Sequence, residues 1–333
     1  AGGLGAIISP PVLGAAAFLI AEFLKISYLD VLLMATVPTL LYYLALFLMV
    51  EIDARKFGMP DVIIDKADTM WELSKRFGFH FLSLVAIVIF LLLGFSPTMS
   101  VVWSTVVAAL VSFLHRDAAL LSYDLFRGSG SWVKHILKSK LVTALEAGSI
   151  GVLNVAATCA AAGLIVGVVT LTGLGLKFSS IVLGYADSGA QGLVDLFGFF
   201  GAEKSAQLLH DMKLLLTSVY TSAIVWIVGL AVPVTASYII CAVIAAPAMI
   251  QLGVPDFAAH MFIFYYAVLS EVSPPTALSP FAAAAITGGD PYKTTLQSWK
   301  YTMPAFLVPF MFVLDSSGQG LLLMGSMKKL AAA

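Results

Sequence analysis

Residues 264–285, FYYAVLSEVSPPTALSPFAAAA, decide the fold of this chain, because the triplet Ser273-Pro274-Pro275 interrupts an apolar helical run. The same triplet, Ser9-Pro10-Pro11, interrupts the apolar run GGLGAIISPPVLGAAAF at residues 2–18. Consecutive prolines remove two amide donors and disfavour helix at the residue before them, so each triplet is expected to break its helix and to leave backbone carbonyls without partners. Inside a lipid bilayer such breaks persist only around a polar cavity.

The composition places these breaks in a membrane. Hydrophobic residues make up 60% of the 333 residues and charged residues only 11%, against about a quarter in soluble domains. The net charge of −1 argues against nucleic acid as a partner. Cys159 and Cys241 both lie in apolar runs, as small packing residues do. We therefore expect an all-α, multi-pass membrane protein that contacts the lipid bilayer, and paired interrupted helices are typical of secondary transporters.

The apolar runs predict a topology. Runs near the roughly 20 residues that cross about 30 Å of hydrocarbon lie at 29–50, 78–96, 99–115, 144–172 and 300–316. Shorter apolar pieces, expected to be half-helices and hairpin arms, lie at 11–24, 208–230, 236–252, 257–271 and 276–287. Lysine and arginine concentrate in 51–77 and 116–140, which places both segments on the cytoplasmic side and 173–207 outside. Basic, Trp-containing segments at 61–77 and 122–141 are expected to be interfacial helices or, alternatively, solvated loops.

The second proline break is the more complete candidate site. Free carbonyls between Glu271 and Thr276 suit a sodium ion, since hard cations favour oxygen ligands. The hydroxyls of Ser270, Ser273 and Thr276 either complete that shell or repair the broken backbone. Glu271 is a proton carrier or a sodium counter-charge, because a carboxylate at membrane depth is costly without such a role. Alternatively it is a solvated acceptor for nearby amides.

Two further irregular stretches complete the candidate machinery. Residues 229–238, GLAVPVTASY, join two short apolar arms and predict the tip of a re-entrant hairpin, the alternative being one proline-kinked span over 210–240. Residues 2–9, GGLGAIIS, predict the unwound centre of the first broken helix, where glycines allow close backbone approach.

An intramembrane hydrolase or lipid-modifying enzyme and a non-transporting scaffold remain alternatives, although no nucleophile motif of the form G-x-S-x-G occurs.

Several stretches resemble the large membrane subunit of tripartite ATP-independent periplasmic (TRAP) transporters. Their sequence is most similar to that of the fused permease of the TAXI-type branch. These stretches are residues 2–23, 163–180, 229–238 and 264–292. The resemblance implies an elevator-type, ion-transporter-like fold with inverted repeats, each holding a hairpin followed by a discontinuous helix. It also implies that the first hairpin lies upstream of residue 1, so that the chain is truncated at its N-terminus.

The resemblance further implies which residues bind ions and substrate. One sodium site would use Gly229, Val232, Thr235, Ser270, Val272 and Pro274, and the other Gly3, Gly5 and Ile8. Substrate would contact Ser9, Pro233, Ser237, Ser273 and Thr276. Sodium, or protons in its place, would drive the import of an organic acid, and no organic cofactor is expected.

The same resemblance implies partners and a location. A periplasmic TAXI-type binding protein would deliver a dicarboxylate, a 2-oxo acid or a glutamate-like compound, and a small membrane subunit would accompany the chain or be fused upstream. The expected location is the cytoplasmic (inner) membrane of a bacterium or archaeon. The expected parts are 1–28 (second half of the first broken helix), 29–143 (scaffold and interfacial helices), 144–207 (a scaffold or transport helix and an exterior insertion at 187–207), 208–299 (second hairpin and broken helix) and 300–333 (last membrane helix and tail).

Overall fold

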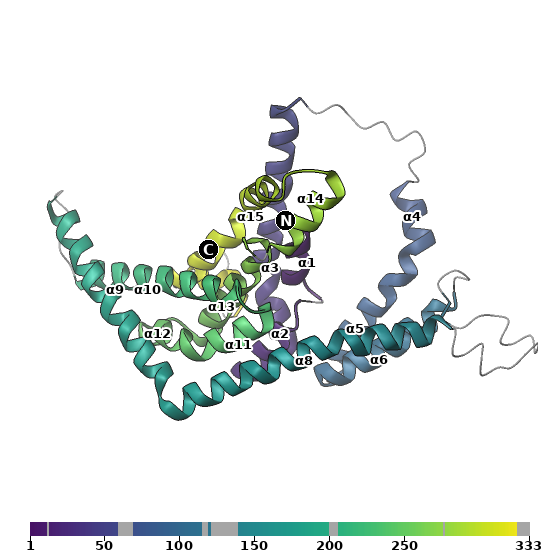
Figure 1. The fold of residues 1–333 in the computed structure, drawn as a ribbon, viewed down its shortest axis with the longest axis horizontal. Coiled ribbons are helices and arrows are strands. Elements are labelled where there is room, and N and C mark those ends of the chain that lie inside the picture. The colour runs from purple at the N-terminus through teal and green to yellow at the C-terminus, as the bar shows by residue number, and fades with distance from the viewer. Residues whose placement is uncertain are drawn as a thin grey trace, which may run out of the picture. The chain divides into compact units, whose positions relative to one another are not determined.

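A computed structural model describes residues 1–11, 13–58, 69–114, 119–120, 139–199, 206–275 and 277–324 (Figure 1). Every regular element within these ranges is a helix and none is a strand, which confirms the all-α class. The α-helices are α1 (Gly2–Ile8), α2 (Ala16–Leu24), α3 (Tyr28–Lys56), α4 (Met70–Phe77), α5 (Leu82–Leu92), α6 (Pro97–Ser112), α8 (Lys140–Thr172), α9 (Leu174–Phe199), α10 (Ala206–Gly229), α11 (Val234–Ile244), α12 (Ala246–Gln251), α13 (Asp256–Leu269), α14 (Leu278–Thr287) and α15 (Pro291–Leu314). Short 3₁₀ turns are η1 (Gly78–Phe81), η3 (Ser270–Val272) and η4 (Gly318–Leu322).

The chain forms two compact units. One consists of Ala1–Gly58 with Thr158–Ala333, and the other of Met59–Ala157. Both proline triplets, the segment at 229–238 and the final helices belong to the first of these, which we call the larger unit.

Helix α13 forms the centre of the larger unit. Every residue from Ala258 to Leu269 is buried, and the helix packs against α10, α11, α12, α15, α2 and α1. A helix that is apolar on all sides finds its stable place where other helices surround it. At the proline break that follows this helix, Val272 and Ser273 are also buried, whereas Pro275 is exposed.

Helix α3 forms one wall around this core. It begins at a capping box, in which the hydroxyl of Ser27 accepts from the backbone and Asp30 accepts from the amide of Ser27 at 3.2 Å. One face packs against α15, α1 and α2, while Leu40, Leu44 and Phe47 are exposed. Exposed apolar side chains on a long helix are what a bilayer-facing surface requires.

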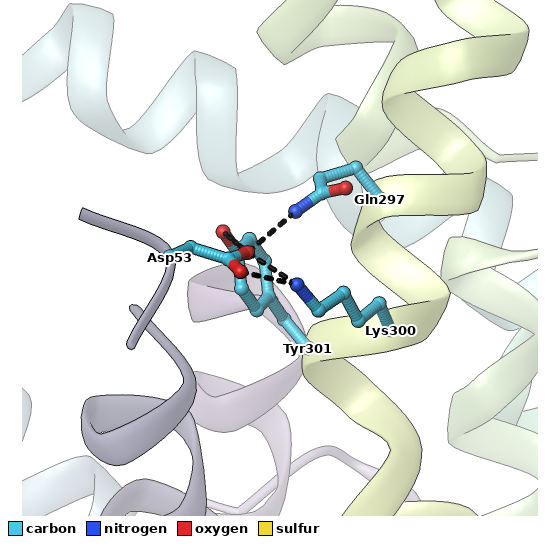
Figure 2. Close-up of polar contacts among 4 residues, drawn as sticks. All are labelled: Asp53, Gln297, Lys300 and Tyr301. Atoms are coloured by element: carbon cyan, nitrogen blue, oxygen red, sulfur yellow. Dashed lines mark hydrogen bonds and ion pairs between the residues drawn. The ribbon is translucent and has the colours of Figure 1, made fainter. Parts of the chain in front are cut away.

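A polar cluster fastens α3 to α15 (Figure 2). The carboxylate of Asp53, on α3, is buried and accepts from Lys300 Nζ, from Tyr301 Oη at 2.8 Å and from Gln297 Nε2 at 3.1 Å. The three donors lie within two turns of α15, so they converge on one acceptor. The side chain of Lys300 is partly exposed, which lets the ion pair keep some solvation. We call these four residues the Asp53 cluster.

Helices α9 and α10 lie side by side in the larger unit (Figure 1). The Nζ of Lys213 in α10 lies 2.8 Å from a carboxylate oxygen of Asp187 in α9. The exterior insertion expected at 187–207 is helical over residues 187–199, which form the C-terminal half of the 26-residue helix α9, and residues 200–205 lie outside the described part.

The smaller unit contains α4, α5 and α6, and α5 packs closely against α6. Helix α4 has a capping box between Thr69 and Glu72, and all its residues are exposed, consistent with the interfacial helix expected near 61–77. The other expected interfacial helix, at 122–141, lies mostly outside the described residues.

Five helical segments are long and apolar enough to cross a membrane: Tyr28–Lys56, Met70–Leu92, Lys140–Thr172, Ala206–Gly229 and Val234–Gln251. Two of them contain the crossings predicted at 29–50 and 144–172, and Met70–Leu92 overlaps the crossing predicted at 78–96. The crossing predicted at 99–115 overlaps α6, whose 16 residues span about 24 Å, so α6 is shorter than the five segments above. The expectation that the pieces at 208–230 and 236–252 are too short to span is wrong, because the corresponding segments Ala206–Gly229 and Val234–Gln251 are both long and apolar enough to cross a membrane. The crossing predicted at 300–316 is the second half of α15, whose first half is polar.

The Asp53 cluster yields a stability prediction. Replacing Asp53 by Asn removes the charge that Lys300 neutralises, leaves that ammonium with only a neutral amide oxygen as acceptor and replaces the second oxygen by an NH₂ donor that faces other donors. We expect Asp53→Asn to lower the unfolding temperature of the purified protein by a few degrees in a thermal unfolding assay. Glu51→Gln is the matched control, since Glu51 pairs with Arg55 on the exposed face of α3 and exposed pairs contribute little. Equal unfolding temperatures for both variants would contradict a role for the cluster in holding α3 to α15.

Candidate functional site

The second proline triplet breaks its helix as predicted. Helix α13 ends at Leu269, the 3₁₀ turn η3 follows, and α14 begins at Leu278. In a continuous helix the carbonyls of Ser270 and Glu271 would accept from residues 274 and 275, which are prolines without an N–H. The Ser270 carbonyl instead accepts from the amide of Ser273 at 3.0 Å. The peptide bond between the two prolines is cis here, as it is at Pro10–Pro11.

The serine hydroxyls at this break are used for its repair. The Ser273 hydroxyl donates to the Leu269 carbonyl at 2.8 Å and accepts from Trp226 Nε1 at 2.7 Å. The Ser270 hydroxyl donates to the Ala267 carbonyl at 2.7 Å. Of the two alternatives for these hydroxyls, the structure therefore favours backbone repair, most clearly at Ser273, which is fully buried. Thr276 lies outside the described residues.

Backbone oxygens at the break differ in their partners. The buried carbonyl of Val272 accepts from Trp299 Nε1 at 3.0 Å, so one of its lone pairs is engaged. Glu271 is half-buried, and its carboxylate has no hydrogen-bond or ion-pair partner among the residues that the structure describes. The side chain and carbonyl of Glu271 are therefore the oxygens best placed to meet a ligand.

Residues 229–234 form the tip of a helical hairpin. Helix α10 ends at Gly229, and α11 begins after Pro233. Both α11 and α12 contact α10, and α12 also contacts α9, so the chain folds back along α10. This packing favours the hairpin over one kinked span across 210–240. Proline at position 233 also removes the donor that the Gly229 carbonyl would meet in a continuing helix.

The hairpin tip touches the proline break through Gly229. A Cβ atom built on Gly229 would lie 2.7 Å from Ser270 Cβ and 2.9 Å from Ser270 Oγ. Only a residue without a side chain permits this approach. The contact brings two regions that are about 40 residues apart in sequence to one place.

A cavity of about 270 Å³ lies where the tip and the break meet. It is lined by residues 229–234 together with Ser270, Glu271 and Leu278. The structure therefore gathers Gly229, Val232, Pro233, Ser270 and Glu271 from the sequence-derived set. Thr235, Ser237, Val272, Ser273 and Pro274 are close in sequence but do not line the cavity. Sequence reasoning missed Leu278, which the break brings back to the cavity.

The first break differs from its prediction. Residues 2–8 form α1 and are helical, so their assignment as an unwound stretch is wrong. The irregular backbone instead follows the helix, because the missing donors are those of Pro10 and Pro11. The Ile8 carbonyl accepts from Thr39 Oγ1 at 2.6 Å, and the Ser9 hydroxyl donates to the Gly5 carbonyl at 2.5 Å.

The first break also lies beside the second broken helix. A Cβ atom built on Gly3 would lie 3.1 Å from Ser279 Oγ in α14. On the other side, a Cβ atom on Gly5 would lie 2.6 Å from the Tyr43 hydroxyl of α3. Two of the three residues expected to form the first ion site, Gly3 and Gly5, are thus positions of close helix approach.

Two interrupted helices around a hairpin, within a multi-pass all-α protein, define a membrane transporter of the broken-helix type. The model for the family described as "Tripartite ATP-independent periplasmic transporter, DctM component" matches residues 1–316. The chain therefore belongs to this family and is a large membrane component of a TRAP transporter. DctM components work with a periplasmic binding protein and a small membrane subunit. Searches among curated proteins and among solved structures each gave no match.

The contact at Gly229 predicts a sensitive position. A methyl group there must displace Ser270, and overpacking of this kind costs about 1–3 kcal/mol. We expect Gly229→Ala to abolish most transport while the protein still folds, measured as uptake per folded protein after reconstitution. Gly192→Ala, in α9, is the control, since a Cβ atom at Gly192 meets nothing within 4 Å. Wild-type uptake by Gly229→Ala would show that the tip and the break need not touch.

Proposed function

We propose that this chain is the permease subunit of a secondary active transporter that imports organic acids. The acid would be a dicarboxylate, a 2-oxo acid or a glutamate-like compound, delivered by a periplasmic binding protein of the TAXI type. A sodium or proton gradient would drive import. The cavity between the hairpin tip and the second proline break is the observation that carries this proposal.

The lining of this cavity suits a cation together with an organic anion. It lies at a helix end and at a helix break, where backbone carbonyls without a helical partner could bind a hard cation. The N-terminus of α11 begins at the same tip and offers amide groups to a carboxylate. When a cation and a carboxylate bind close together, their attraction offsets part of the free energy that each loses on desolvation.

Glu271 supplies the only formal charge among the described residues that line the cavity. It would act as the counter-charge of a bound sodium ion or as the carrier of a coupled proton. In either role its carboxylate would bind the driving ion, while the substrate would be held by the neighbouring tip. The absence of a protein partner for Glu271 within the described residues leaves its oxygens available for this purpose.

Movement would follow the elevator scheme of alternating access. The larger unit holds both breaks and the hairpin around one buried helix, so these elements can move as one body. Membership of a transporter family also favours a carrier over the hydrolase, the lipid-modifying enzyme and the passive scaffold.

The proposal is tested by transport. The complete transporter, reconstituted into proteoliposomes with its binding protein, should accumulate a labelled organic acid when a sodium or proton gradient is imposed. Collapsing each gradient separately with an ionophore identifies the coupling ion. Uptake that ignores both gradients would reject the coupled-carrier function.

Glu271 gives a sharper prediction. Glu271→Gln keeps the size of the side chain and removes its charge. If sodium drives uptake, the sodium concentration for half-maximal uptake should rise several-fold. If protons drive it, uptake by the variant should stop responding to pH. Glu51→Gln, on the exposed face of α3, should leave both profiles unchanged. Unchanged profiles for Glu271→Gln would reduce Glu271 to a structural residue.

A further inference from the structure

Two tryptophans from different helices donate hydrogen bonds to the second proline break. Trp226, on α10, donates from Nε1 to the Ser273 hydroxyl at 2.7 Å. Trp299, on α15, donates from Nε1 to the Val272 carbonyl at 3.0 Å. Both acceptors are fully buried. The consecutive residues 272 and 273 are thus each fixed by an indole group from a different helix.

The break takes part of its hydrogen bonding from outside its own helix. Pro274 and Pro275 have no amide hydrogen, and although the Ser273 amide donates locally to the Ser270 carbonyl, the Val272 carbonyl accepts from Trp299. An indole N–H can only donate, and it sits on a rigid ring with few rotatable bonds. It therefore fixes the position of an acceptor more firmly than a hydroxyl does, since a hydroxyl can rotate and can also accept.

The two rings support each other. Their centroids lie 5.8 Å apart at an interplanar angle of 63°, an edge-to-face contact. Both rings also line an apolar cavity of about 360 Å³ together with Tyr266 and Phe306. Because space adjoins both rings, a phenylalanine can replace either tryptophan without overpacking.

The helix that carries each tryptophan makes a second contact close to it. Trp226 lies three residues before Gly229, so α10 carries both the donor to Ser273 and the glycine that touches Ser270. Trp299 lies between Gln297 and Lys300 on α15, and both of these bind Asp53 of α3 (Figure 2). The Asp53 cluster thus limits rotation of α15 at the level of Trp299.

We propose that Trp226 and Trp299 are positioning residues for cation binding at the junction of the tip and the break. By fixing Val272 and Ser273, they keep the oxygens of Ser270 and Glu271 in register with the hairpin tip. Neither indole touches the cation in this arrangement. The inference deepens the proposed transport function and rests on it.

The test removes one hydrogen bond at a time. Trp226→Phe and Trp299→Phe keep an aromatic ring and lose the N–H group. If sodium is the coupling ion, each variant should need about two- to tenfold more sodium for half-maximal uptake at saturating substrate, the value of one hydrogen bond. Trp103→Phe, on α6 of the smaller unit, is the matched control because Trp103 is exposed. Its sodium titration should equal that of the wild type.

A second readout does not depend on the coupling ion. Amide hydrogen exchange, measured without sodium on the complete transporter, should accelerate in the segment 264–280 of both variants and remain unchanged elsewhere. Faster exchange throughout the protein would instead indicate general destabilisation and overturn the positioning role.

The outcomes separate this inference from the function on which it rests. Wild-type uptake that responds to neither gradient rejects the transport proposal, and the exchange data then decide whether the tryptophans hold the break. A sodium-dependent wild type with unchanged titrations in both variants overturns the inference and leaves the transport proposal standing.

Discussion

The larger unit depends on one constraint: the backbone that Pro274 and Pro275 interrupt must be satisfied without water. Within hydrocarbon an unpaired peptide group costs several kcal/mol, so the carbonyls at the break need donors from the nearby backbone or from side chains. The Ser270 carbonyl accepts from the Ser273 amide, the Leu269 carbonyl from the Ser273 hydroxyl and the Val272 carbonyl from the indole of Trp299. The indole of Trp226 in turn donates to the Ser273 hydroxyl. This requirement is consistent with the position of the break at the buried C-terminal end of α13 and with the packing of α10 and α15 against it. The cavity beside the break lies against backbone that is held in this way.

Helix α3 extends the same logic to the first break. Its Thr39 donates to the Ile8 carbonyl, and its Asp53 binds three side chains of α15. One helix therefore supports the first break directly and the second through α15. Although its sequence suggests a place among scaffold helices, α3 packs with the two breaks in the larger unit. Its exposed apolar face is then available to lipid or to other membrane helices.

The two helix breaks and the hairpin could be predicted from the sequence, because they depend on local properties of proline and glycine. Proline removes a donor wherever it stands, so the positions of both breaks followed from Pro10 and Pro274, and the hairpin followed from the join at Gly229 and Pro233. The prediction that residues 2–9 are unwound relied on their glycines and was wrong, since residues 2–8 are helical. Glycine permits irregular backbone but does not require it. The partners of the break could not be foreseen. Trp226 and Trp299 reach it from helices whose rotation is set by packing, and no sequence spacing encodes that rotation.

The close approach of Gly3 to Ser279 restricts how these two positions can change among related proteins. With 3.1 Å between a Cβ atom at position 3 and the serine oxygen, the opening of the chain and the far half of the second interrupted helix share one small volume. A larger residue on one side leaves no room for the other. Among related chains, positions 3 and 279 should accordingly change size in compensation, and their paired substitution would record that contact across evolutionary time.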